Sequence, residues 1–130
     1  MKDLSYKLFF KALANRTRFE IVELLRTGAK TVGEISERLG YEQSRISHNL
    51  KCLEDCGFVT IQQNGKNRVY SLEPTTILPI LALIDEHITR YHDHIEKCGI
   101  IQLRFHEIFE GDMKPVDEPI VPPIVEGGRQ

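Results

Sequence analysis

Apolar residues recur at three- and four-residue intervals along the first half of the chain, the spacing that places side chains on one face of a helix. The predicted helices run over about 4–13, 16–26, 32–39 and 43–56. Asn15 is positioned to cap the second helix, and Thr31 with Glu34 has the form of a capping box at the start of the third. Gly40 and Gly57 follow the third and fourth helices and end them.

Two runs of residues that favour β-strands, 58–63 and 68–72, stand on either side of Asn64-Gly65. An Asn-Gly pair between such runs is a strong signal for a β-hairpin. The order helix, short helix, tight turn, helix and hairpin is that of a winged helix-turn-helix. The sequence therefore predicts a mostly α fold with a β-hairpin wing.

A long helix is predicted over 76–98, with Pro79 in its first turn, where backbone N–H groups lack helical partners and proline is tolerated. One set of its apolar residues follows the a/d spacing of a coiled coil. This seam consists of Ile77, Leu81, Ile84, Ile88, Tyr91 and Ile95. Leu78, Ile80 and Leu83 offer a second apolar face near the helix start. We therefore interpret the seam as a homodimer interface.

The chain is expected to divide near residue 98. Residues 1–98 would form a winged helix-turn-helix domain that includes the dimerisation helix over about 76–98. Residues 99–130 would form a C-terminal extension with a proline-containing tail, in which 100–110 is compatible with a short helix or a strand.

Composition places the chain in a broad class. Of its 130 residues, 41% are hydrophobic and 28% charged, which is typical of a single globular domain. No apolar run approaches the ~20 residues of a membrane-spanning helix, and the N-terminus lacks the apolar core of a signal peptide. The three cysteines are therefore expected to be reduced thiols of a cytoplasmic protein with no membrane partner.

The charges are unevenly distributed. Residues 1–72 carry 12 Lys/Arg against 8 Asp/Glu, a net charge of +4, whereas residues 73–130 carry 5 against 11, a net charge of −6. A mildly basic N-terminal part is compatible with a polyanionic partner such as nucleic acid.

Polar residues lie off the apolar stripe of the helix predicted over 43–56, and two cations lie on the wing. They are Gln43, Ser44, Arg45, Ser47, His48 and Lys51 on the helix, with Lys66 and Arg68 on the wing. Such amide, hydroxyl and cationic groups bind base edges and phosphates. We expect Arg45 and Ser47 to help read bases, and Lys66 and Arg68 to bind mainly phosphate.

Several segments, taken in order, resemble the ArsR/SmtB family of metal-responsive repressors. They are FKALANRTR (10–18), VGEI (32–35), QSRISHNL (43–50) and GFV (57–59), and the resemblance covers roughly residues 5–98. It implies a homodimeric DNA-binding repressor with a double-stranded operator as its partner. Because a dimer presents two recognition helices, an inverted repeat is the expected form of that operator.

Cys52 and Cys56 are four residues apart on a predicted helix, so their side chains share a face at about 6 Å, which suits two thiolates on one ion. Cys98 is a third ligand candidate. This placement resembles the cadmium/lead-sensing branch of the family, and implies release from DNA by a thiophilic ion of the cadmium, lead, zinc or arsenite class. Thiol oxidation without a metal is an alternative.

The family's other metal site, on the dimerisation helix, is matched only by Asp85 and His87, because its second half would fall at Cys98 and Ile101. These two residues are therefore a weaker alternative. No glycine-rich phosphate loop, nucleophile elbow or His-Glu-x-x-His motif occurs, so an enzyme is not expected. A ligand-independent regulator and a dimeric protein-interaction adaptor remain as further alternatives.

Overall fold

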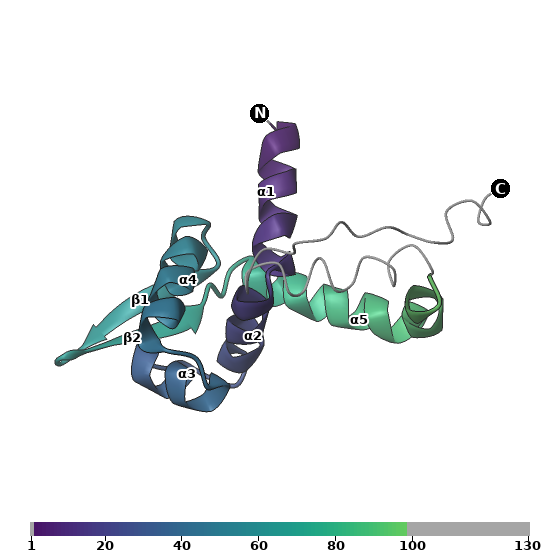
Figure 1. Ribbon diagram of the computed structural model, residues 1–130. Helices are drawn as coiled ribbons and strands as arrows, with labels where there is room; N and C mark the ends of the chain where they lie inside the picture. Colours follow the sequence, from purple (N-terminus) through teal and green to yellow (C-terminus); the bar gives the residue numbers. More distant parts are fainter. Residues whose placement is uncertain (1, 99–130) are drawn as a thin grey trace, which may run out of the picture.

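The computed structural model describes residues 2–98, which form five helices and one two-stranded sheet (Figure 1). In chain order the elements are α1 (Lys2–Ala14), α2 (Arg16–Leu25), α3 (Val32–Leu39), α4 (Gln43–Asp55), β1 (Val59–Asn64), β2 (Asn67–Leu72) and α5 (Ile77–Glu96). This order confirms the predicted mostly α fold with a hairpin wing. The helix ends differ from the predicted ones by no more than the one or two residues by which such boundaries vary.

Side-chain caps fix where α2 and α3 begin. The side chain of Asn15 accepts a hydrogen bond of 2.9 Å from the backbone N–H of Arg18. The Thr31 hydroxyl accepts one from the N–H of Glu34, and the Glu34 carboxylate accepts one from the N–H of Thr31, which completes the predicted capping box. The end of α3 is fixed by Gly40, whose φ of +78° lies in the left-handed region that favours glycine.

The wing is an antiparallel hairpin of β1 and β2 whose two-residue turn begins at Gly65. Asn64 pairs with Asn67, so the turn starts one residue later than an Asn-Gly turn would. Gly65 has a φ of +65° and no non-glycine residue in the range 2–98 has a positive φ, which matches a type II′ turn. The backbones of Lys30 and Tyr70 exchange hydrogen bonds of 3.0 and 2.8 Å, which attach the wing to the connection between α2 and α3.

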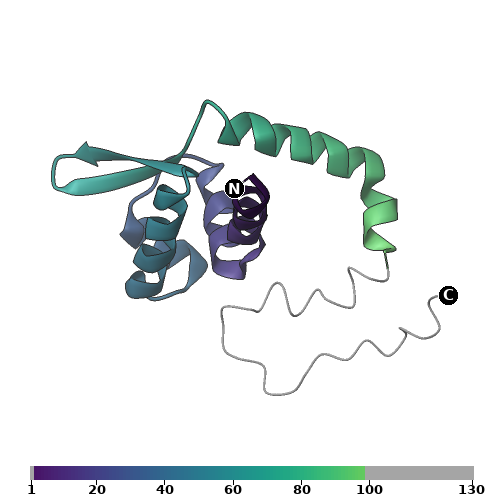
Figure 2. The same ribbon diagram turned by 90° about the horizontal axis from the view of Figure 1, so that it is seen from above.

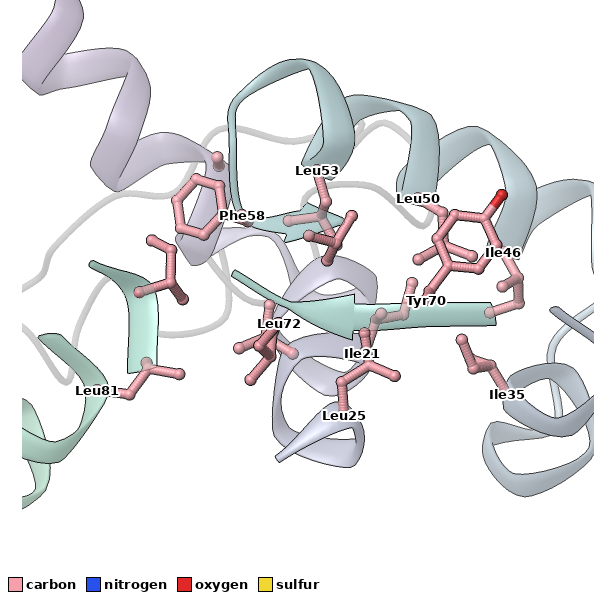
Figure 3. Close-up of a cluster of buried hydrophobic side chains, with 14 residues drawn as sticks. Ile21, Leu25, Ile35, Ile46, Leu50, Leu53, Phe58, Tyr70, Leu72 and Leu81 are labelled. Carbon is pink, nitrogen blue, oxygen red and sulfur yellow. The ribbon is translucent and has the colours of Figure 1, made fainter. Parts of the chain in front are cut away.

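The core lies where α2, α3 and α4 meet the wing (Figure 3). Its fully buried apolar side chains are Ile21, Val22, Ile35, Ile46, Leu50, Leu53 and Phe58. The first helix joins this core through Phe9, whose ring stacks on that of Phe58 with 5.0 Å between the centroids. Since the core takes the apolar stripe of α4, the opposite face of that helix is left to solvent.

The last helix, α5, packs on the winged part at its beginning and then runs outward from it (Figures 1 and 2). Ile77 and Leu81 are buried in the core, with exposed fractions of 5% and 7%. These two residues therefore do not belong to an intersubunit seam, contrary to the prediction. Leu78 and Leu83 are exposed and only Ile80 of the second apolar face packs against the core. The a/d spacing does not encode which part of a helix meets its own domain, so it does not separate these two buried residues from the exposed rest of the seam.

The remaining seam residues of α5 are exposed to solvent in the single chain. They are Ile84, Ile88, Tyr91 and Ile95. Tyr91 departs from helical geometry, with φ −116° and ψ 20°, so α5 is kinked there. The seam therefore does not continue as one straight coiled-coil stripe through Ile95.

The predicted C-terminal extension, residues 99–130, lies outside the described residues, as does the short helix or strand predicted over 100–110. Among residues 2–98, no helix combines the length and the apolar character that crossing a membrane requires.

Candidate DNA-binding surface and metal site

The solvent-facing side of α4 carries a continuous set of polar side chains. The exposed members are Gln43, Ser44, Ser47, His48 and Lys51. Their spacing keeps them on one face, opposite the buried apolar stripe, because residues four apart on a helix are neighbours. The structure thus gathers five of the six residues that the sequence proposed on this helix.

A groove of about 750 Å³ lies between α4, the beginning of α3 and the wing. Its lining residues are Thr31, Val32, Gly33, Ser47, Lys51, Glu54, Lys66, Asn67, Arg68 and Tyr70. It brings together Ser47 and Lys51 from the helix with Lys66 and Arg68 from the wing, which are remote in sequence. Three of these four are cations, against the one carboxylate of Glu54 in the lining, so the groove favours an anionic partner.

The cations of this groove are held only weakly. The Lys51 ammonium lies 3.3 Å from the carboxylate of Asp55, and both side chains are well exposed, so this ion pair adds little stability and can be exchanged for a phosphate. The Arg68 guanidinium lies 5.9 Å from the centroid of the Tyr70 ring, within range of a cation–π interaction. Both cations remain part of the groove lining.

Arg45, proposed from the sequence as a base reader, is placed differently from its neighbours. Its side chain is half-buried, and its Nε and Nη2 atoms donate hydrogen bonds of 2.9 and 2.6 Å to the hydroxyl of Thr17 in α2. Its guanidinium also lies over the Tyr41 ring, 4.0 Å from the centroid. The guanidinium is thus engaged inside the fold rather than directed to solvent.

A second polar contact between α2 and α4 was not found from the sequence. Arg18 donates to the side-chain oxygen of Asn49 at 3.1 Å and to the backbone oxygen of Ala12 in α1 at 2.8 Å. The amide of Asn49 in turn donates to the backbone oxygen of Arg45 at 3.0 Å. The sequence does contain a sign of this buried polar contact: Asn49 is a polar residue at a helical position between Ile46 and Leu53, where an apolar residue is expected.

Cys52 lies in the last turn of α4 and Cys56 is the C-cap residue that follows it, so the two cysteines are one helical turn apart, as predicted. Cys52 is half-buried and Cys56 exposed. Partial burial raises the pKa of the Cys56 thiol, and the neighbouring Cys52 raises it further through charge and a hydrogen bond, whereas Arg18 lowers it. A metal ion bound by this pair would therefore have to displace protons from it.

Cys98 does not join this pair within one chain. It follows the end of α5, which runs away from α4 (Figure 2). Across residues 2–98, no group of three or more His, Cys, Asp or Glu side chains is arranged to hold a metal ion. A metal ion with three ligands at Cys52 and Cys56 would therefore need one from outside residues 2–98 or from a second subunit.

The alternative site at Asp85 and His87 is also incomplete. The Asp85 carboxylate receives hydrogen bonds from both terminal nitrogens of Arg26, and this guanidinium lowers the pKa of Asp85. The His87 ring lies against that of Tyr91, with 4.8 Å between centroids. Because an arginine already neutralises the carboxylate, a metal ion at this position would have to displace it.

The hairpin wing beside a polar, cationic helix face defines a winged helix-turn-helix protein. The chain is similar to the homodimeric winged helix-turn-helix domain of Mb0332 from Mycobacterium bovis, described as a possible ArsR-family regulator and solved by NMR. The two share 27% identity at a TM-score of 0.63, over 69% of this chain and 83% of that one.

The family model described as "Bacterial regulatory protein, arsR family" matches residues 15–60. The transcriptional regulator NmtR of Mycobacterium tuberculosis is 39% identical over 90 residues, which are 69% of this chain and 71% of NmtR. A probable mercury resistance operon repressor of Streptomyces lividans is 36% identical over 75 residues, 58% of this chain, and the match spans 60% of that relative. The chain belongs to the ArsR family, and it is a DNA-binding transcriptional regulator rather than an enzyme.

Alkylation of Cys56 is expected to need a higher pH than alkylation of an unperturbed cysteine, because the thiolate reacts and its pKa is raised. Cys52→Ala removes the neighbouring thiol and should move the Cys56 profile to lower pH. Iodoacetamide labelling at a series of pH values, read by mass spectrometry, measures both profiles. The remote wing variant Gln62→Ala should leave the profile unchanged. Identical profiles for Cys52→Ala and wild type would contradict the interaction.

Proposed function

We propose that this protein is a homodimeric repressor that binds a double-stranded DNA operator through α4 and the wing, and that a thiophilic metal ion releases it. The observation that carries the DNA-binding mode is the cationic groove that joins Ser47 and Lys51 to Lys66 and Arg68. The relative named as a probable mercury resistance operon repressor supports both the repression and the response to metal.

In this proposal α4 enters the major groove and the wing lies along the adjacent backbone. Ser44, Ser47 and His48 project from the exposed face of α4 and are suited to hydrogen bonds with base edges. Lys66 and Arg68 belong to the tip and the second strand of the wing, where phosphates would be within reach. Gln43 and Lys51 lie at opposite ends of the same helix face and would contact the backbone on either side.

A second copy of the chain is the partner that the exposed apolar residues require. On α5 these are Leu78, Leu83, Ile84, Ile88, Tyr91 and Ile95, and on α1 they are Leu4, Tyr6, Leu8 and Phe10. The apolar groove between the two helices, which Phe9 and Ile80 line, continues this surface. The homodimeric state of the related Mb0332 domain supports the choice of a second copy. A two-fold dimer would present two α4 helices about one DNA turn, ~34 Å, apart and therefore match an inverted repeat.

Cys52 and Cys56 would supply two thiolates to the metal ion, with Cys98 of the second subunit as the third. The ion supplies a strong attraction for thiolates, and soft ions of the cadmium, lead, zinc or arsenite class fit this donor set. The resemblance to the cadmium/lead-sensing branch supports the assignment. Because Cys52 lies in α4 and Cys56 is its C-cap residue, drawing them toward Cys98 would displace the helix proposed to hold DNA. Release follows only if the ion binds the DNA-free conformation more tightly.

A thiol-redox response is the second candidate, because Cys52 lies one helical turn from Cys56 and helps to raise the pKa of its thiol. Oxidation of these thiols would change α4 without any metal. Peroxide that weakens operator binding, with recovery on adding a thiol reductant and no effect of cadmium, would favour this candidate over the metal sensor.

DNA binding is tested by gel shift with the DNA upstream of the protein's own gene, against unrelated DNA of the same length. Lys66→Ala should weaken binding to all sequences alike and make the salt dependence shallower by about one unit, because one phosphate contact is lost. Thr60→Ala, an exposed neutral position on the wing, is the matched control and should keep the wild-type slope. Wild-type protein that binds both DNAs equally would count against an operator-specific repressor.

Dimerisation is tested by Ile88→Glu, which places a charge in the apolar surface of α5. The variant should sediment as a monomer at concentrations where wild type is a dimer, and operator binding should fall with it because two half-sites can no longer be bound together. Thr89→Glu introduces the same charge beside the seam and should leave the dimer intact. An unchanged sedimentation coefficient for Ile88→Glu would rule out this interface.

Metal release is tested by titrating cadmium into the protein–operator complex. Operator affinity should fall several-fold to roughly a hundredfold, the usual range of such couplings, together with thiolate-to-metal charge-transfer absorption. Cys52→Ser and Cys56→Ser should weaken both effects while retaining metal-free operator binding. If both variants still release DNA at the wild-type cadmium concentration, the sensing site lies elsewhere, with Asp85 and His87 as the next candidates.

A further inference from the structure

A set of polar contacts, which we call the Arg45 clasp, fixes the beginning of α4 to α2. It consists of Arg45, Thr17, Tyr41 and Glu20. The guanidinium of Arg45 donates two hydrogen bonds to the Thr17 hydroxyl and stacks over the Tyr41 ring. The Tyr41 hydroxyl donates to a carboxylate oxygen of Glu20 at 2.7 Å, and Glu20 also lies 3.6 Å from the guanidinium of Arg16. The clasp therefore spans from the first two turns of α2 to the first turn of α4.

The start of α4 lacks the local device that fixes α2 and α3. Its N-cap residue, Glu42, makes no side-chain hydrogen bond to the helix, whereas Asn15 and Thr31 cap the other two. Helix starts without such a cap are less well defined. The tertiary contacts of Arg45 take over this role, because they attach the first turn of α4 directly to α2.

Arg45 differs from its neighbours on α4 because its side chain contacts a buried residue instead of facing solvent. The Thr17 side chain is fully buried, with an exposed fraction of 0%, so it cannot contact DNA in the folded protein. Ser44, Ser47 and His48, on either side of Arg45, are exposed. Turning Arg45 outward toward a base would remove a charged donor from the buried Thr17 hydroxyl, and hydrogen bonds of this kind are costly to break.

We propose that Arg45 is a positioning residue of the DNA-binding surface, acting through Thr17 and Tyr41, and that it does not read a base. The clasp sets the rotation and depth of the first turns of α4, so that Ser44, Ser47 and His48 meet the base edges together. This inference rests on the proposed DNA-binding function and changes the role that the sequence assigned to Arg45.

The test compares Arg45→Ala, Arg45→Lys and Thr17→Val at a temperature where circular dichroism shows each variant to be folded. Each variant is titrated with the upstream operator fragment, with a panel of its single base-pair changes and with unrelated DNA. Arg45→Ala and Thr17→Val should both lose operator affinity by about tenfold, the scale of one base contact, evenly over the panel. Binding to unrelated DNA should be unchanged. Arg45→Lys keeps a cation over Tyr41 and one donor for Thr17, so it should recover part of the loss.

Ser44→Ala is the matched control, since it removes an exposed hydroxyl and should change preference at one or two adjacent base pairs only. If Arg45→Ala alters preference at a single base pair while Thr17→Val binds like wild type, Arg45 reads a base and the proposal is overturned. If folded Arg45→Ala binds the operator as wild type does, the clasp serves stability alone and the proposal is likewise overturned. Wild-type protein that does not distinguish the operator from unrelated DNA would instead overturn the proposed function itself.

Discussion

The structure depends on holding α4 in one place while its outer face stays polar and open. Apolar burial of Leu50 and its neighbours fixes how deeply the helix sits, but hydrophobic contact has no direction and permits sliding or rotation. Directional contacts remove that freedom. Arg18 joins α2 to Asn49 and to α1, while Arg45 joins the first turn of α4 to Thr17. Because these contacts lie on the buried sides of α4, the residues on its exposed face are not needed to hold the helix in place and are available to bind a partner.

The position of the wing is also fixed by a directional contact with the helical part of the fold. Lys30 pairs with Tyr70 in β2, so the hairpin is attached to the connection that precedes α3 rather than standing free. Lys66 and Arg68 consequently lie across a groove from Lys51 on α4. The groove therefore combines one cation of α4 with two cations of the wing, which favours an anionic partner.

The two ends of α5 differ in their surroundings: its beginning packs into the core, and its later turns are exposed. Its first turns complete the core through Ile77 and Leu81, and Arg26 at the end of α2 forms an ion pair with Asp85 one turn later. Beyond that point the apolar residues Ile88, Tyr91 and Ile95 are exposed. Cys98 lies at this outer end, remote from the cysteines of α4 in the same chain. In the proposed homodimer, a second copy would cover this apolar surface and supply Cys98 as the third ligand.

The sequence by itself determined the features that depend on near neighbours: the cap at Asn15, the capping box at Thr31 and the presence of the hairpin, whose turn nevertheless begins one residue later than the Asn-Gly pair indicated. Helical periodicity also determined which side chains share a face of α4. Only the tertiary structure decided what each face meets. It directed Ile77 into the core instead of a dimer seam and turned Arg45 toward α2 instead of solvent. Periodicity fixes the angles between side chains around one helix, whereas the orientation of that helix is set by long-range packing that no local pattern records.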